Sequence, residues 1–305
     1  MSAKNINKIR KTKEDWAVDI VVYIIMAVVF LACLYPFYYS LVISFNEGID
    51  ASRGGIFFWP RKFTLENYQA VFKDENLLKA YGVTISRTLI GTVSSVLFTA
   101  LFSYALAHKN LMGRRFYTML LIISMYFGGG LIPYFILIKK IYLMNTFWVY
   151  IIPSLLSAFN AIIMMNFFRE LPAELEESAK IDGANDVMIF FRIIFPISKP
   201  VLATIALFNG VGHWNAWFDS AYYVTDKSLK TVAFRLMELV NQANLTSVSG
   251  ADALSQRAGT MAAQTFTAET KRMATMIVVV VPIILVYPFL QKYFVKGIMI
   301  GSVKG

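Results

Sequence analysis

The side chains that most often perform catalysis or bind metal ions are scarce in this sequence. Among 305 residues there are two histidines, His108 and His213, and one cysteine, Cys33. Zinc sites use three or four protein ligands, mostly of these two residue types, so this set cannot form the usual zinc site. The sequence also lacks a G-x-x-x-x-G-K-[ST] phosphate loop and a G-x-S-x-G nucleophile turn. We therefore expect a chain that is not an enzyme and that itself binds no metal or cofactor.

One polar segment between two apolar stretches has residue types suited to protein docking. Glu176–Pro200 reads EESAKIDGANDVMIFFRIIFPISKP. Just before it, Pro172 suits the first position of a helix, and the glutamates that follow are stabilised by the positive end of that helix. Gly183 is expected to end the helix, because glycine readily adopts the left-handed conformation of a C-terminal cap.

A second short helix is expected from about Asp186, ended by Pro196 and Pro200. Two short helices at an angle, joined at a glycine, would let another backbone approach closely. This shape favours a protrusion that sits in the groove of a partner protein. An amphipathic helix lying on the membrane, with its acidic face solvated, is the alternative interpretation.

A second group of residues has types suited to sugar binding, because sugars have apolar ring faces and many hydroxyl groups. These aromatic and polar residues gather after an apolar stretch: Asn209, His213, Trp214, Asn215, Trp217, Phe218, Asp219, Tyr222 and Tyr223. An interfacial belt of Trp and Tyr would have the same composition without any sugar. Tyr126, Phe127 and Gly129, within the Gly128–Gly130 triplet, are candidates for a gate in a substrate pathway.

The elements that position these residues are predicted to be membrane-spanning helices. Hydrophobic residues make up 57% of the chain and charged residues only 16%. A soluble domain of this length cannot bury so much apolar surface. A span needs about 20 apolar residues, and in lipid its backbone must be helical. Six spans are expected, at about residues 20–45, 85–107, 116–138, 141–168, 200–218 and 273–291.

The distribution of basic residues predicts which side each connection faces. Lys and Arg crowd residues 1–19, the connector after the second span and the carboxyl end, which places both termini and the 169–199 loop in the cytoplasm. The net charge of +10 is then a membrane-surface signature, because anionic lipid headgroups attract basic residues. No nucleic-acid-binding module is recognised. The long connections 46–87 and 219–272 would face outward, the first with a short helix at 64–72 and the second with a helix leading into the sixth span.

The 169–199 loop resembles the signature loop of the permeases of ATP-binding-cassette (ABC) importers. That signature is E-A-A, three residues, G, nine residues, then I-x-L-P, and here it reads Glu177-Ser178-Ala179, Gly183, Ile193 and Phe195-Pro196. The DGA sequence at 182–184 is similar to the carbohydrate-importer branch, as are NFFRELPAELEESAKIDGA, WNAWFDSAYYV and the tail YPFLQKYFVKGIMIGSVKG. The resemblance covers roughly residues 36–305 and is strongest to maltose-permease-like subunits.

This resemblance implies a fold, a role and a set of partners. Residues 20–296 would form a permease domain of six transmembrane helices, whose loop 169–199 is a coupling helix gripped by a cytoplasmic ATPase, and residues 297–305 a cytoplasmic tail that contacts the ATPases through Gly301 and Lys304. The residues that it implies for ATPase docking are Glu177, Ser178, Ala179, Asp182, Gly183, Ala184 and Pro196.

The implied assembly is a bacterial plasma-membrane importer for a sugar or oligosaccharide. Its other parts would be a second related permease, two ATPases that bind ATP and Mg²⁺, and an extracytoplasmic solute-binding protein. The candidates for a substrate pathway in this chain are Tyr126, Phe127, Gly129, Asn209, Asn215 and Trp217.

Three alternatives remain open at this point. One is an ABC importer for another solute, and a second is an ion-coupled carrier that works alone. The third is a membrane enzyme. The predicted spans contain no carboxylate pair or basic residue in their interiors, which disfavours an ion-coupled carrier, since such carriers usually display ionisable groups there.

Overall fold

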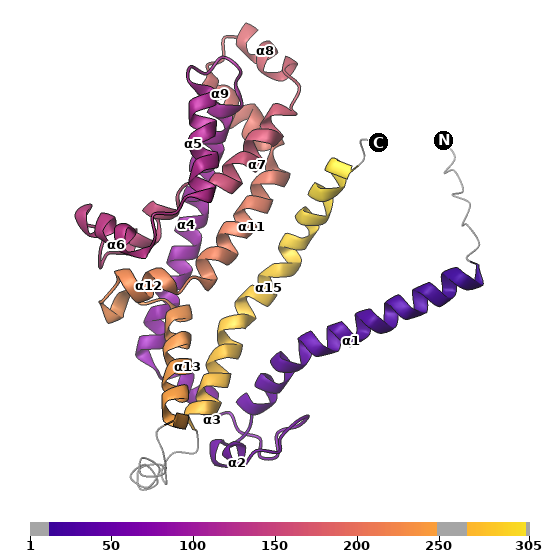
Figure 1. Cartoon of the computed structure of the whole chain (residues 1–305), viewed down its shortest axis with the longest axis vertical. Helices are drawn as coiled ribbons and strands as arrows, with labels where there is room; N and C mark the ends of the chain where they lie inside the picture. Colours follow the sequence, from indigo (N-terminus) through magenta and orange to yellow (C-terminus); the bar gives the residue numbers. More distant parts are fainter. Residues whose placement is uncertain (1–11, 249–266, 303–305) are drawn as a thin grey trace. The chain divides into compact units, whose positions relative to one another are not determined.

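The chain is helical throughout the part that the structure describes. The computed structural model describes residues 12–248 and 267–302, and every named element in these ranges is a helix (Figure 1). This agrees with the all-α class expected from the sequence. The chain divides into two compact units, which within the described ranges comprise residues 12–69 with 267–277 and residues 70–248 with 278–302.

The first unit contains the longest apolar helix near the amino end. Helix α1 (Lys13–Ser44) begins with a capping box, in which Thr12 accepts from the Asp15 amide and Asp15 accepts from Thr12. The most apolar 18-residue stretch of α1 has no buried residue in this chain. Such a surface is stable only against lipid or another protein, as expected of a membrane span.

A polar cluster fixes the turn that follows α1. The Asn67 side chain on α3 (Glu66–Phe72) donates to the carbonyl oxygens of Ser44 and Asn46, both at 2.8 Å. Asn46 in turn donates to Asp50 on α2 (Gly48–Ser52), which also pairs with Arg61 at 3.1 Å. Helix α3 is the short helix that the sequence predicts within residues 64–72.

The second unit is built on three helices that pack along one another. Helix α4 (Glu75–Ala107) contacts both α7 (Ala158–Arg169) and α11 (Lys199–Asn215) (Figure 1). Small side chains allow this close packing, and a buried hydroxyl bonds across it: Ser103 donates to the Ala161 carbonyl at 3.0 Å. Tyr104 and Met164 belong to the apolar core between these helices.

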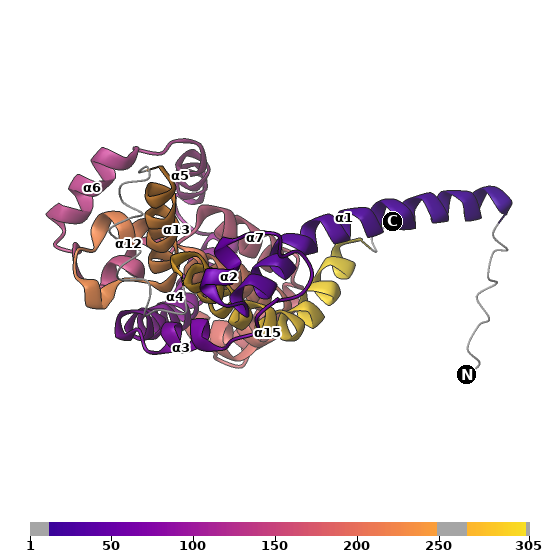
Figure 2. The ribbon, with the colours of Figure 1, turned by 90° about the horizontal axis from the view of Figure 1, so that it is seen from below.

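The other elements of this unit connect these three helices along the sequence or follow the last of them. They are α5 (Arg114–Tyr126), α6 (Leu131–Lys140), η1 (Phe147–Tyr150), η2 (Ile152–Ser154), α8 (Glu174–Ile181), α9 (Asp186–Ile189), η3 (Phe190–Ile194), α10 (Phe195–Ile197), α12 (Phe218–Tyr223), η4 (Lys227–Leu229) and α13 (Val232–Val248). Helix α15 (Ala268–Ser302) extends through the boundary between the two units. Figure 2 shows α6 and α12 on the same side of α4, and the two are in contact.

Several predicted spans differ from the helices in the structure. The span at 116–138 is broken at the glycine triplet, as that triplet predicts: α5 ends at Tyr126 and α6 begins at Leu131. The span at 141–168 is not one helix, because residues 141–157 form turns and two short 3₁₀ helices before α7. The outward loop assigned to 46–87 ends at Asp74, which caps α4 with its side chain, so Arg87 lies within that helix.

The number of spans stays a prediction. By length and composition, α1 and α4 are each able to cross a membrane, and two bent pairs of helices in the described ranges raise that number to four. One pair joins 147–154 to α7 at 45°, and the other joins 186–197 to α11 at 82°.

Candidate functional site

The predicted docking loop is present as a helix, a glycine turn and a second helical run. Glu174, Glu176 and Glu177 lie in the first turn of α8, where the helix dipole favours negative charge. Gly183 follows the Asp182 cap with φ of +81°, as its position requires, and a Cβ there would meet no atom within 4 Å. The loop therefore has a left-handed residue with open space above it.

The second helical run begins and ends where the sequence predicts. Residues 186–197 form one continuous helical run through α9, η3 and α10, which ends between Pro196 and Pro200. The run contains a π-helical turn at Phe190–Ile194, which widens the backbone just before Pro196 and which the sequence does not predict. Pro200 lies in the first turn of α11.

The docking residues implied by the signature divide between the surface and the core. Ala179 is 7% exposed and packs in the core with Tyr104 and Phe190. It anchors α8 to the helices below. Ala184 is partly buried, and the others are exposed: Glu177, Ser178, Asp182, Gly183 and Pro196.

An apolar patch accompanies these exposed residues. The side chains of Ile181, Val187 and Phe191 are 86%, 63% and 48% exposed, although all three are large and apolar. Apolar groups exposed on a structured protrusion indicate a protein contact. Glu176 does not belong to this surface, because its carboxylate oxygen lies 3.6 Å from Nδ1 of His108 at the end of α4.

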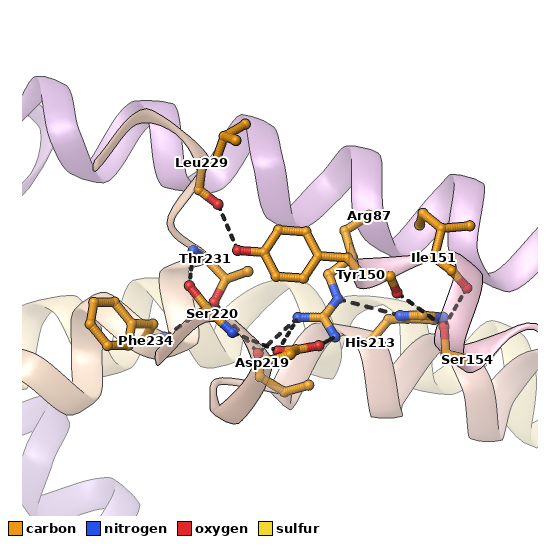
Figure 3. Close-up of polar contacts among 11 residues, drawn as sticks. Arg87, Tyr150, Ile151, Ser154, His213, Asp219, Ser220, Leu229, Thr231 and Phe234 are labelled. Carbon is orange, nitrogen blue, oxygen red and sulfur yellow. Dashed lines mark hydrogen bonds and ion pairs between the residues drawn. The ribbon is translucent and has the colours of Figure 1, made fainter. Parts of the chain in front are cut away.

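A buried ion pair in the first half of α4 was not identified from the sequence. Arg87, which is 3% exposed, pairs through two nitrogens with the carboxylate of Asp219 on α12 (Figure 3). It also donates to the Ala216 carbonyl at 3.1 Å and to Nδ1 of His213 at 3.4 Å. Its guanidinium carbon lies 4.6 Å from the centre of the Tyr150 ring.

The pair was not predicted because Arg87 and Asp219 lie far apart in the sequence. In the sequence Asp219 belongs to the group suited to sugar binding and Arg87 lies at the start of the span predicted at 85–107, and the two are 132 positions apart. A charged residue facing the interior of a membrane helix bundle is a signal that could have identified the pair.

The ion pair lies far from the predicted docking loop. Arg87 and His108 are 21 positions apart along α4, and His108 contacts Glu176 of the loop. At a rise of 1.5 Å per residue, the separation is about 30 Å.

A cavity of about 460 Å³ lies beside this ion pair. Its lining comes from α6, from η1 and η2, and from α12, and it includes Tyr134, Tyr150, Ser154, Phe218, Asp219 and Tyr223. Asn145 connects the segment after α6 to the end of α12. Its backbone amide donates to the Tyr223 carbonyl at 2.8 Å, and its side chain accepts from the amides of Thr225 and Asp226.

The residues predicted for a substrate pathway do not form one site in this chain. Asn209 is used within the bundle, where it accepts from Asn160 on α7 and donates to Ser95 on α4, both at 3.1 Å. The remaining candidates are at the surface: Tyr126, Phe127, Gly129, Asn215 and Trp217. Among the predicted tail contacts, Gly301 lies in α15, and Lys304 lies outside the described residues.

Comparison with known proteins identifies the family. The model of the family described as "Binding-protein-dependent transport system inner membrane component" matches residues 8–300. The chain belongs to this family.

Curated members of the family resemble this chain over nearly its whole length. Protein LplC of Bacillus subtilis is 37% identical over 98% of this chain and 99% of its own. The polygalacturonan/rhamnogalacturonan transport system permease protein YtcP of the same species is 35% identical over 94% of this chain and 98% of its own. The arabinooligosaccharides transport system permease protein AraQ of Halalkalibacterium halodurans is 27% identical over 89% of this chain and 91% of its own.

A solved structure has the same fold. It is a chain of a bacterial ABC transporter involved in the import of the acidic polysaccharide alginate, with a TM-score of 0.85 and 28% identity. The match covers 93% of this chain and 99% of that one. This chain is thus an inner-membrane component of a binding-protein-dependent transport system, and it works within a complex of several subunits.

Proposed function

We propose that this chain is the permease subunit of an ABC importer for a sugar or oligosaccharide. It forms half of the translocation pathway and pairs with a second, related permease. Two ATPase subunits bind ATP and Mg²⁺ and supply the energy, and an extracytoplasmic binding protein delivers the sugar. The relatives named for polygalacturonan, rhamnogalacturonan and arabinooligosaccharide transport support the sugar class.

The observation that carries this proposal is the exposed loop 174–197. A structured protrusion with Glu177 and Ile181 on its surface and Ala179 in the core can transmit force, because movement of α8 must move the helices packed beneath it. We assign the loop to the cytoplasmic face, with both chain termini on that side and six spans in all. The carboxylate of Glu177 pairs with a basic residue of the ATPase. The open space above Gly183 accepts the backbone of the ATPase.

The location of Arg87 agrees with a membrane-spanning α4. Its distance from the loop, about 30 Å along α4, matches the thickness of the hydrocarbon core of a membrane. With the loop in the cytoplasm, Arg87, Asp219 and the cavity lie near the outer face, where the binding protein releases its sugar. The tail residues Gly301 and Lys304 then lie on the cytoplasmic side and contact the ATPases.

Substitution of Glu177 tests the docking role. Glu177→Lys reverses one charge at the docking surface, and we expect it to weaken ATPase binding and to abolish ATP-dependent sugar uptake in vesicles. Glu174→Lys is the matched control, because Glu174 is also exposed and lies in the same helical turn. It changes the net charge and the helix-dipole interaction equally.

Two outcomes would count against the proposal. Normal uptake by the Glu177→Lys variant would remove the docking role of Glu177. Uptake driven by an ion gradient, by the purified chain in liposomes without any ATPase, would exclude an ABC importer altogether.

A further inference from the structure

The cavity beside Arg87 and Asp219 has the composition of a carbohydrate site. Two of its rings, Tyr134 and Phe218, are 38% and 42% exposed, so a ligand can reach their faces. Tyr150 and Tyr223 also line the cavity, and both are buried. Aromatic faces pack well on the apolar C–H faces of sugar rings. The volume of about 460 Å³ lies within the range of small-ligand pockets, about 300–1,000 Å³.

Asp219 supplies a fixed hydrogen-bond acceptor in the wall. Its Oδ1 accepts from Arg87 at 3.0 Å and from the Ser220 amide at 2.9 Å, and its Oδ2 accepts from the second arm of Arg87. A carboxylate has about four acceptor positions, so these three bonds leave capacity for one ligand hydroxyl. The side chain is 22% exposed, and Arg87 prevents it from rotating away.

The charge of the lining favours neutral sugars over acidic ones. Asp219 is the one charged residue among the described residues that line the cavity, and its partner Arg87 is not part of that lining. Because Arg87 neutralises Asp219, a uronate carboxylate would find no cation within the described lining to offset the loss of its hydration. Hydroxyl groups lose less hydration and can donate to Asp219.

From these observations we infer that this chain has its own sugar subsite, which takes a neutral hexose or pentose unit between Tyr134 and Phe218 with a hydroxyl donated to Asp219. The inference rests on the proposed function, since the sugar reaches the cavity only in an importer of this class. Arg87 is a positioning residue in this site. Its guanidinium holds the Asp219 carboxylate without lining the cavity itself.

Cysteine protection tests this subsite directly. The sequence has a single cysteine, so Cys33→Ser gives a background without thiols. Ser154→Cys then places a thiol in the cavity wall, and Thr225→Cys places a control thiol on the same outer segment but outside the cavity. Labelling by a charged thiol reagent is measured in right-side-out vesicles from cells that make the chain with its partner subunits. The probes are galactobiose, arabinobiose and digalacturonate.

We expect the neutral disaccharides to slow labelling at position 154 several-fold and to leave position 225 unchanged. Digalacturonate should protect less. Phe218→Ala should raise the half-protecting concentration about tenfold, the value of one aromatic contact. Trp148→Ala is the matched control, because Trp148 is also aromatic, is 55% exposed and does not line the cavity.

Uptake of the same saccharides, measured in the same vesicles, separates the two proposals. ATP-dependent uptake of a neutral saccharide with unchanged labelling at position 154 would overturn the subsite and leave the importer function standing. Stronger protection by digalacturonate than by galactobiose would overturn the preference for neutral sugars. If no saccharide is taken up, the result counts against the proposed function, while protection at position 154 still reports whether the cavity binds a sugar.

Discussion

Arg87 on α4 and Asp219 on α12 form a two-armed ion pair across 132 positions of sequence. The pair attaches the segment that follows α11 to the central helix of the second unit (Figure 3). Within the same segment, the ammonium of Lys230 donates to the carbonyl oxygens of Ser220 and Val224 at 2.7 and 2.5 Å and so fixes the end of α12. The position of α12, and with it one wall of the cavity, therefore depends on two cations.

The two halves of this ion pair should differ in their effect on stability. Asp219→Ala leaves a guanidinium that is 3% exposed without its counter-ion, which costs about 3–5 kcal/mol. Arg87→Met leaves a carboxylate that is 22% exposed and can be hydrated, so a smaller loss of about 1–3 kcal/mol is expected. Thermal unfolding of the purified chain in detergent measures both. Equal or reversed midpoints would show that the pair is more hydrated than its burial indicates.

Gly91 should not tolerate even one additional methyl group. A Cβ at this position would lie 2.5 Å from Nε2 of His213, so Gly91→Ala forces α4 and α11 apart and costs about 1–3 kcal/mol. Gly82→Ala on the same helix is the control: nothing lies within 4 Å, and the gain in helix propensity should stabilise by about 0.5–1 kcal/mol. Combining Gly91→Ala with His213→Ala should cost less than the sum of the two single changes.

Asn209 should act on stability rather than on sugar affinity. Asn209→Ala removes its bonds to Asn160 and Ser95 and leaves their buried polar groups without these partners, a loss of about 1–3 kcal/mol. Asn215→Ala, at an exposed site on the same helix, should change stability by less than about 0.5 kcal/mol. Unfolding midpoints and the KM of uptake are measured together. A raised KM with an unchanged midpoint for Asn209→Ala would instead place this residue in the substrate pathway.

The segment after α1 should loosen in acid. The hydrogen bond from Asn46, followed by the contact with Arg61, holds the pKa of Asp50 below its ordinary value of 3.8. A carboxylate with a lowered pKa contributes stability that is fully present above the unfolded pKa and is lost as the pH falls through the folded one. Protection of the amides of residues 44–69 from hydrogen exchange should therefore fall below about pH 4. Asp50→Asn should abolish this dependence, and a persistent fall in that variant would assign it to another group.

Features that depend on local sequence were predictable. The first turn of α8, the left-handed Gly183 and the break between α5 and α6 follow from helix-end preferences and from glycine, which act over a few residues. Helix α3 was predictable for the same reason. The signature loop also identified the family correctly, because its spacing is fixed over a single short segment.

Local rules were less successful where packing overrides them. Residues 141–157 are as apolar as a span, yet they fold as turns and 3₁₀ helices in which Tyr150 donates to the Leu229 carbonyl at 2.8 Å. The helix from Asp186 ends between Pro196 and Pro200 as those prolines predict, but the π-helical turn that precedes Pro196 was not predictable from them. Apolar composition alone does not distinguish a lipid-facing helix from a segment buried in protein.

The sequence by itself determined that this is a helical membrane permease with a signature loop, because composition and a short motif carry that information without reference to the fold. Only the tertiary structure decided which distant side chains meet: Arg87 with Asp219, Asn209 with Asn160 and Ser95, and the aromatic rings around one cavity. The physical reason is that these contacts depend on the packing of helices far apart along the chain. Neither hydrophobicity nor helical periodicity specifies which helices become neighbours.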